Sequence, residues 1–219
     1  MCLIILRVGG SNVPNDVIEV NRRKNPDGFG LAWRSGGKVH SVKFGPKDFD
    51  AFKKKLKELD RQAGIEYTAH FRMATHGPAC EDLSHPFTYE DKEHGTIAVF
   101  HNGIINIDTD RKTESDTSTF VKQVLSKMGS GWWKNSAYRF LVEQAIGYSR
   151  LLIMTPTETI RLNENAWVKS GGIMYSTDPG GSHSKYQSYA LPKGIVPPAP
   201  FAVPNTKSVV KYTPPKEWL

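Results

Sequence analysis

The start of the chain carries the feature that most restricts its fold. Residues 2–8 form a strongly apolar segment that begins at the second residue, Cys2. A short apolar run is typical of a strand buried on both faces, and such a strand needs a packed layer on each side. The run is too short for the core of a signal peptide, and no basic segment precedes it. We therefore expect a cytoplasmic protein with an internal strand at its start and with reduced thiols.

Size and composition exclude several classes of protein. The 219 residues are 38% hydrophobic and 23% charged, which is enough to bury a core and excludes wholesale disorder. The two cysteines, Cys2 and Cys80, cannot build a disulfide framework. No apolar run approaches the ~20 residues of a membrane helix. We therefore expect no membrane association.

The formal charge of +7 raises the question of nucleic-acid binding. The densest basic stretch, residues 53–57, lies among acidic residues and carries no signature of a nucleic-acid-binding motif. The apolar residues that recur around it at helical spacing are Phe49, Phe52, Leu56 and Leu59. This pattern predicts an amphipathic helix whose lysines face solvent, and no nucleic-acid partner.

Hydrophobic periodicity predicts strands and helices in an irregular order. The expected strands are 2–8, 29–34, 38–44, 65–72, 96–101, 150–154, 158–162, 166–168 and 173–176. The expected helices are 14–23, 48–62, 116–128 and 136–146, with Ser11 or Asn12 capping the first and Ser115 capping the third. Residues 73–86 are expected to form a loop. Mixed strands with interspersed helices indicate an α+β protein built in layers.

The composition changes near residue 190. Seven of the 14 prolines lie in residues 191–219, and proline removes backbone donors and favours extended conformations. We therefore predict a single domain over residues 2–190 and a Pro-rich C-terminal tail over residues 191–219. The tail is either a flexible or surface-bound terminus or a docking arm that uses Tyr212 and Trp218.

Cys2 is the most informative candidate for chemistry. Removal of Met1 would leave Cys2 with a free α-amino group, whose reference pKa of about 7.7–8 allows an appreciable neutral fraction at physiological pH. That amine could accept the thiol proton through a bridging water, so that one residue supplies both nucleophile and base. The alternative is a buried cysteine that merely opens a core strand.

A second candidate segment, residues 69–78, closes a strand and opens a loop. Arg72 offers a planar fork suited to a substrate carboxylate. Thr75, His76 and Gly77 place polar groups and accessible backbone beside it. The alternative is a surface arginine with structural histidines nearby.

Two further motifs follow. Asn102 and Gly103 put an amide side chain and a glycine N–H at a strand end, which are the parts of an oxyanion hole; a hairpin turn is the alternative. Asp116 either caps the helix that follows it or pairs with an amino group of a substrate.

Five of the seven histidines fall within 32 residues, and these are His70, His76, His85, His94 and His101. Such a cluster raises the possibility of zinc. However, the sequence contains neither an HExxH nor a CxxC pattern, and Cys80 has no nearby partner. We predict no metal and no cofactor.

Taken together, these motifs resemble the class II glutamine amidotransferases, the N-terminal nucleophile (Ntn) hydrolases with a catalytic cysteine directly after the initiator methionine. The matching segments are Cys2, residues 27–30 (Asp-Gly-Phe-Gly), 72–77 (Arg-Met-Ala-Thr-His-Gly), 85–87 (His-Pro-Phe), 101–103 (His-Asn-Gly) and 115–117 (Ser-Asp-Thr). The resemblance covers about residues 2–130 and is strongest to stand-alone members. It implies a single-domain, four-layer αββα sandwich with Cys2 at the start of a strand.

The resemblance also implies a reaction. The Cys2 thiolate would attack the side-chain amide of glutamine, with Asn102 and the Gly103 N–H stabilising the oxyanion. Ammonia would leave, and water would release glutamate from the thioester.

The resemblance further implies how the substrate is held. Arg72 would bind the α-carboxylate, Asp116 the α-amino group, and Thr75 and His76 would line the pocket. Because no synthase domain fits in the remaining tail, the ammonia would pass to a separate acceptor enzyme.

Two other functions remain open on the sequence. The first is hydrolysis of another γ-glutamyl amide, such as a glutathione-like or thiol-bearing conjugate. The second is a non-catalytic module that binds an amino acid or a partner protein. The first alternative uses the same glutamyl head group, so the sequence barely separates it from glutamine hydrolysis.

Overall fold

β1 (Leu3–Arg7) occupies the interior of the protein. The structure, a computed structural model, describes residues 2–180. β1 pairs on one side with β4 (Tyr67–Phe71) and on the other with β10 (Ile173–Tyr175), antiparallel in both cases. All five of its residues are buried, which confirms the prediction of a strand covered on both faces.

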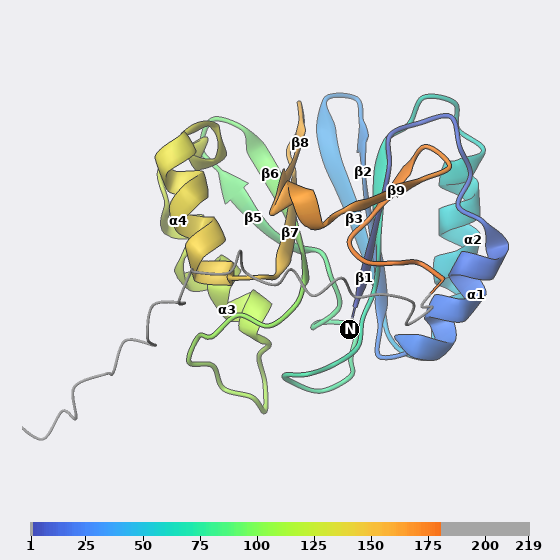
Figure 1. Ribbon diagram of the computed structural model, residues 1–219, viewed down its shortest axis with the longest axis horizontal. Coiled ribbons are helices and arrows are strands. Elements are labelled where there is room, and N and C mark those ends of the chain that lie inside the picture. The colour runs from blue at the N-terminus through green and yellow to red at the C-terminus, as the bar shows by residue number, and fades with distance from the viewer. Residues whose placement is uncertain (1, 181–219) are drawn as a thin grey trace, which may run out of the picture. The chain divides into compact units, whose positions relative to one another are not determined.

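Two antiparallel sheets form the centre of the fold (Figure 1). Within the described residues, the first has six strands in the order β3-β2-β4-β1-β10-β9 and the second has four in the order β5-β6-β7-β8. The remaining strands of the first sheet are β2 (Phe29–Ser35), β3 (Lys38–Phe44) and β9 (Val168–Ser170). The second sheet comprises β5 (Phe87–Asp91), β6 (Gly95–Asn102), β7 (Arg150–Met154) and β8 (Thr159–Leu162).

Helices pack against the sheet faces that point away from the other sheet (Figure 1). Those on the six-stranded sheet are α1 (Asn15–Lys24) and α2 (Phe49–Asp60). Those on the four-stranded sheet are α3 (Asp116–Gln123) and α4 (Ser136–Ile146). The short 3-10 segments of the described chain are η1 (Leu125–Lys127), η2 (Trp132–Lys134) and η3 (Glu164–Ala166).

The position of β1 explains why its sequence is apolar at consecutive positions. Leu3 and Ile5 belong to the core between the first sheet and its helices. Ile4 and Leu6 belong to a separate core between the two sheets, where Phe100 of β6 is also buried. Neighbouring residues of a strand point to opposite faces, so a strand between two cores needs apolar side chains on both.

Most of the predicted elements are present, but several details are wrong. β5 was not expected, although the apolar and polar residues of 87–91 largely alternate as in a half-buried strand. Residues 164–166 form a 3-10 turn, so the strand expected at 166–168 lies at 168–170 instead. The first helix is capped by neither Ser11 nor Asn12, because Pro14 occupies the N-cap position without a side-chain hydrogen bond.

The third helix begins as predicted and ends early. The Ser115 hydroxyl accepts the Ser118 N–H while the Ser118 hydroxyl accepts the Ser115 N–H, which is a reciprocal capping box. The α-helix ends at Gln123, and the chain continues as η1 rather than as helix to residue 128.

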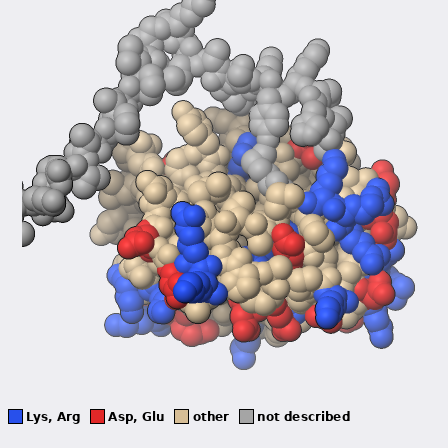
Figure 2. All heavy atoms as spheres, turned by 90° about the horizontal axis from the view of Figure 1, so that it is seen from below, with Lys and Arg blue, Asp and Glu red and all other residues tan. Residues whose placement is uncertain are grey.

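α2 has the solvent-facing lysines that its periodicity predicts. Its buried apolar residues are Phe49, Phe52, Leu56 and Leu59. On the outer side, Lys53 pairs with Glu19 and Lys57 pairs with Asp60. On the face seen from below, basic and acidic side chains lie side by side (Figure 2).

Residues 2–180 belong to one compact unit. Within that range, no helix is both long and apolar enough to cross a membrane. The predicted tail over residues 191–219, with Tyr212 and Trp218, lies outside the described residues, and its role stays a prediction.

Candidate active site

Cys2 lies directly before β1, at one end of the space between the two sheets (the lower end in Figure 1). Its sulfur accepts a hydrogen bond from the Met73 N–H, with 3.3 Å between nitrogen and sulfur. It lines a cavity of about 20 Å³. The other lining residues are Arg72, Met73, Thr75, His76, His85, His101, Gly103, Ser115, Asp116 and Thr117. The fold thus brings every predicted site residue except Asn102 to the surface of one cavity.

Arg72 reaches the cavity because β4 lies next to β1. In the β1–β4 register Leu3 faces Phe71, so the residues that adjoin these positions, Cys2 and Arg72, come out at the same sheet edge. The Arg72 side chain is only 3% exposed, which excludes an ordinary surface arginine. Its guanidinium donates to the carbonyls of Pro78 at 2.7 Å and His76 at 2.9 Å. An arginine has five N–H donors, so others remain for a carboxylate.

The loop after Arg72 is braced by the Asp-Gly-Phe-Gly segment of the sequence. The Asp27 N–H donates to the Arg72 carbonyl at 3.0 Å, and the Asp27 carboxylate accepts the Ala74 N–H at 2.8 Å. Gly30 is needed for close packing, because a Cβ there would lie 1.7 Å from the carbonyl oxygen of His85. The motif therefore supports the loop and does not itself line the cavity.

Asn102 and Gly103 lie where β6 ends, and they are placed differently. Gly103 lines the cavity, whereas Asn102 is fully buried behind it. Asn102 Nδ2 donates to Ser176 Oγ at 2.9 Å. Gly103 has a φ of +148°, and a Cβ there would lie 2.1 Å from Ser149 Oγ. β6 pairs with β5 and β7, so the turn after Asn102 is not the hairpin that was the alternative interpretation.

Asp116 is the first residue of α3 and lines the cavity. Its two carboxylate oxygens accept the backbone N–H groups of Ile105 and Thr117, each at 2.8 Å. Ser115, not Asp116, is the helix cap, so the capping interpretation of Asp116 is wrong. Oδ1 also accepts the Thr117 hydroxyl at 3.4 Å, whereas Oδ2 has a further lone pair that can accept a hydrogen bond from a ligand ammonium.

Thr75 and His76 form the outer wall of the cavity. Thr75 is exposed and His76 is partly exposed. Thr75 Oγ1 and His76 Nδ1 are 3.4 Å apart. Both residues belong to the loop that is held by Arg72, so a movement of this loop would widen the cavity.

Two histidines at the cavity were not predicted as site residues. His85 and His101 line it, and both are buried. The ring of His85 stacks against His70 with 4.1 Å between centroids, and His101 Nδ1 lies 2.8 Å from Thr117 Oγ1. Both lie in segments that carry the family resemblance, 85–87 and 101–103, and both belong to the histidine cluster that raised the possibility of zinc. Within residues 2–180, no group of three or more His, Cys, Asp or Glu side chains is placed to hold a metal ion.

Burial keeps these imidazoles neutral. It lowers the pKa of His70 to about 3 and the pKa of His85 well below its usual value. Burial also lowers the pKa of His101 to about 4, although the nearby Asp116 carboxylate acts in the opposite direction. At neutral pH the two histidines that line the cavity, His85 and His101, are therefore uncharged.

The fixed charges at the cavity are those of Arg72 and Asp116. Burial also raises the pKa of the Cys2 thiol, while the Met73 N–H and the Arg72 cation oppose this effect. A thiol of raised pKa needs a base to become a nucleophile at neutral pH. The site can thus offer a sulfur atom, a cation and an anion to a small zwitterion.

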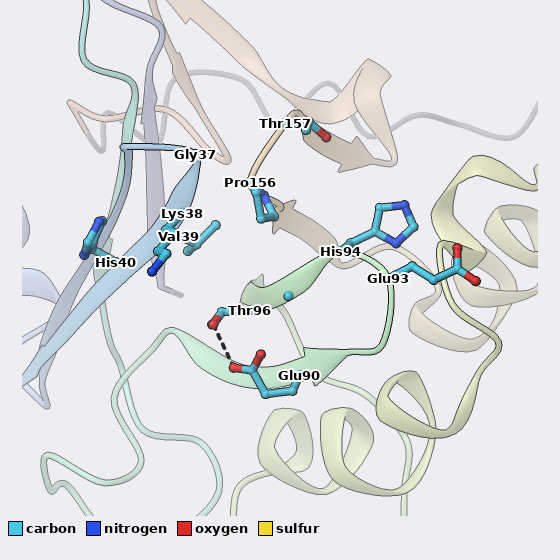
Figure 3. Close-up of a pocket in the computed structure, with 11 residues that line it drawn as sticks. Gly37, Lys38, Val39, His40, Glu90, Glu93, His94, Thr96, Pro156 and Thr157 are labelled. Carbon is cyan, nitrogen blue, oxygen red and sulfur yellow. Dashed lines mark hydrogen bonds between the residues drawn. The ribbon is translucent and has the colours of Figure 1, made fainter.

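A second hollow, of about 650 Å³, lies at the opposite end of the space between the sheets (Figure 3). The turns β2–β3, β5–β6 and β7–β8 surround it. Lys38 and Val39 lie on one side of it, and Glu90 and Thr96, joined by a hydrogen bond of 2.7 Å, lie on the other (Figure 3). None of the seven predicted site residues lines this hollow.

The two antiparallel sheets with their helices form a fold that is also found among glutamine amidotransferases. The glutamine phosphoribosylpyrophosphate (PRPP) amidotransferase from B. subtilis, solved with ADP and GMP, is similar with a TM-score of 0.54 and 17% sequence identity. The match covers 80% of the present chain and 41% of that enzyme. A structure described as the allosteric regulatory enzyme of purine biosynthesis is similar with the same scores and coverage.

At this level of identity the likeness shows the fold. No protein-family model matches the chain, and no curated protein matches it in sequence. The present chain spans less than half the length of either solved enzyme. The resemblance to the class II glutamine amidotransferases therefore holds at the level of the mixed α/β architecture with two antiparallel sheets.

Proposed function

We propose that this protein hydrolyses the side-chain amide of glutamine through Cys2 and delivers the ammonia to an acceptor. One observation carries the proposal: the cavity at the start of β1 is lined by the Cys2 thiol together with a buried cation, Arg72, and a buried anion, Asp116. Buried charges are costly unless they are paired or used. This pair is complementary to the zwitterionic end of an amino acid.

The first half-reaction forms a thioester. With Met1 removed, the α-amine of Cys2 takes the thiol proton and the sulfur attacks the amide carbon of glutamine. The oxygen becomes an oxyanion, which the Gly103 N–H and Asn102 Nδ2 stabilise by hydrogen bonding. When the C–N bond breaks, the ammonium form of the amine returns the proton to the leaving nitrogen, and ammonia departs.

The second half-reaction regenerates the enzyme. The α-amine of Cys2 takes a proton from a water molecule, whose oxygen attacks the thioester carbon. A second oxyanion forms in the same position. Its collapse breaks the C–S bond, the proton returns to sulfur, and glutamate is released.

Substrate binding follows from the same contacts. Arg72 holds the α-carboxylate, Asp116 accepts hydrogen bonds from the α-ammonium, and Thr75 and His76 close the pocket from outside. A cavity of about 20 Å³ has room for about one water molecule. Glutamine therefore enters only when the loop of residues 73–78 moves outward.

The proposal also covers the fold that holds the site and the acceptor of the ammonia. The helix layers on both sheets support a four-layer αββα Ntn arrangement over residues 2–190. We assign the ammonia-accepting step to a separate synthase in the cytoplasm. The chemistry needs no metal or cofactor.

The test is glutamate release from glutamine by wild type, Cys2→Ala and Cys80→Ala. Cys80 is the matched control, since it is the other free and partly exposed cysteine. We expect activity in wild type and Cys80→Ala and none in Cys2→Ala. Equal rates in wild type and Cys2→Ala would refute the proposal.

Two further measurements separate the alternatives. Mass spectrometry should find Met1 absent and diazo-oxonorleucine attached to Cys2, whereas an unlabelled Cys2 would favour a non-catalytic binding module. A panel of γ-glutamyl amides should show a preference for glutamine. A preference for a thiol-bearing conjugate would keep the mechanism but change the substrate.

A further inference from the structure

One oxygen atom links the Cys2 strand to the amide of Asn102. Ser176 follows β10 and is fully buried. Its Oγ accepts the backbone N–H of Ile4 at 2.9 Å and Asn102 Nδ2 at 2.9 Å. The Ser176 N–H in turn donates to the Ile4 carbonyl at 2.9 Å. Ser176 thus ties the backbone two residues after Cys2 to the side chain at the end of β6.

In the described part of the chain, the Asn102 side chain has no hydrogen-bond partner other than Ser176. Its Oδ1 is buried and accepts no hydrogen bond there. The amide orientation therefore depends on the single bond from Nδ2 to Ser176. An amide NH₂ has two hydrogens, so one remains when the other is held by Ser176.

We infer that Ser176 is the positioning residue for the oxyanion-binding amide of Asn102. Its hydrogen bonds fix the rotation of the Asn102 amide and the distance of that amide from β1, the strand that follows Cys2. They leave the second Nδ2 hydrogen of Asn102 for the developing oxyanion. This inference rests on the proposed function. It adds a residue that directly follows β10 and lies 74 positions after Asn102 in the chain.

The geometry also separates Ser176 from substrate binding. Neither Ser176 nor Asn102 lines the Cys2 cavity, but the Ser176 Oγ is already engaged by two protein donors, whereas Asn102 keeps one Nδ2 hydrogen for the oxyanion. A defect at Ser176 should therefore reach the reaction only through Asn102, in the transition state, and leave binding of the glutamyl head unchanged.

The decisive experiment is a double-mutant cycle on the full chain with Ser176→Ala, Asn102→Ala and the double variant. We expect Ser176→Ala to lower kcat for glutamate release roughly tenfold, the effect of one hydrogen bond, with KM within about twofold of wild type. Added to Asn102→Ala, it should lower kcat no further. Independent, multiplying effects or an unchanged kcat would overturn the inference.

Two controls keep the result interpretable. Ser170→Ala removes an exposed hydroxyl from the neighbouring β9 and should leave both constants unchanged. If Ser176→Ala does not fold, Ser176→Cys fills the same space with a weaker acceptor, and we expect a smaller loss in kcat. Full wild-type kcat in Ser176→Cys would count against the hydrogen bond.

A measurement without turnover separates failure of this inference from failure of the proposed function. In protein labelled with ¹⁵N-asparagine, the Asn102 side-chain signals are identified by their loss in Asn102→Ala. We expect slow exchange of one Nδ2 proton in wild type and faster exchange in Ser176→Ala. Equal exchange would refute the positioning role, whereas a wild type without glutaminase activity would refute only the proposed function.

Discussion

The two ends of the space between the sheets differ in volume and in the burial of their charged residues, and the smaller end holds the more deeply buried charges. The end at Cys2 holds a cavity of about 20 Å³, and the other end holds a hollow of about 650 Å³. In the small cavity Arg72 and Asp116 are 3% and 5% exposed. Around the large hollow the charged residues Lys38, Glu90 and Glu93 are exposed.

This contrast shows which feature marks a site in this molecule. A charged side chain at the surface is solvated at no cost, and a hollow between turns forms wherever two sheets diverge. A buried cation and a buried anion beside a thiol have given up solvation. The buried charged groups that meet beside Cys2 therefore identify this end as the candidate site, whereas the volume of a hollow does not.

The strongest test of the contrast compares the nucleophile with a residue of the hollow. Cys2→Ala should lower glutamate release at least roughly a thousandfold, because no other group can form the thioester. Lys38→Ala should stay within about twofold of wild type. A large loss in Lys38→Ala, measured in the same glutamate assay, would show that the hollow takes part in the reaction.

A pair of glycines sharpens the comparison. Gly103 and Gly95 both have positive φ, but only at Gly103 would a Cβ meet another atom, Ser149 Oγ. Gly103→Ala should displace the oxyanion N–H and lower kcat by roughly 10²–10³. Gly95→Ala should cost about 1 kcal/mol of stability and leave kcat unchanged. Parallel kinetics and thermal melts check both, and equal kcat values would remove Gly103 from the oxyanion site.

A pair of carboxylates tests recognition of the substrate amine. Asp116→Asn keeps the shape but removes the charge, so KM for glutamine should rise roughly 10- to 100-fold, the effect of one charge-assisted hydrogen bond. Glu90→Gln, at the hollow, should leave KM unchanged. Initial-rate kinetics over a range of glutamine concentrations measure both; an unchanged KM in Asp116→Asn would mean that Asp116 is structural.

The buried histidines predict a smaller, pH-dependent effect. Burial lowers the pKa of His70 to about 3 and of His101 to about 4, below the ~6.5 of an unfolded chain. The unfolded state then binds more protons, so stability falls as pH falls below about 7 toward the folded pKa values. Each histidine should lower the free energy of unfolding by roughly 0.7 kcal/mol between pH 7 and pH 6.

Urea unfolding at several pH values measures this slope. His70→Phe should flatten it, because one titrating group is removed. His40→Gln, at an exposed position near the hollow, should leave the slope as in wild type. An unchanged slope in His70→Phe would show that His70 does not drive the pH dependence.

Much of the fold could be predicted from local patterns. The apolar residues at 2–8 predict a strand between two cores, and the helical spacing of Phe52 and Leu56 predicts the buried face of α2. Both follow from side-chain periodicity within one element. β5 was missed although its residues largely alternate between apolar and polar, and the first helix cap was missed because Pro14 occupies the N-cap position without a side-chain acceptor.

The candidate site could likewise be predicted only in part from the sequence. Arg72 and Asp116 lie at the ends of predicted elements, where polar residues beside turn signals are visible in the sequence. Their meeting with Cys2, and the full burial of Asn102 behind Gly103, depend on the strand order β4-β1-β10 and on the packing of β6 against that sheet.

By itself, the amino-acid order determined which segments are strands and helices, which faces they bury and which short motifs could carry chemistry, because these properties arise from neighbours within a few residues. Only the tertiary structure decided that His70, His85 and His101 share one buried wall, and that Ser176 holds both Ile4 and Asn102. Those contacts join residues that lie between 15 positions (His70 and His85) and 172 positions (Ile4 and Ser176) apart in the chain. No local pattern encodes such contacts, since they form only when whole layers pack together.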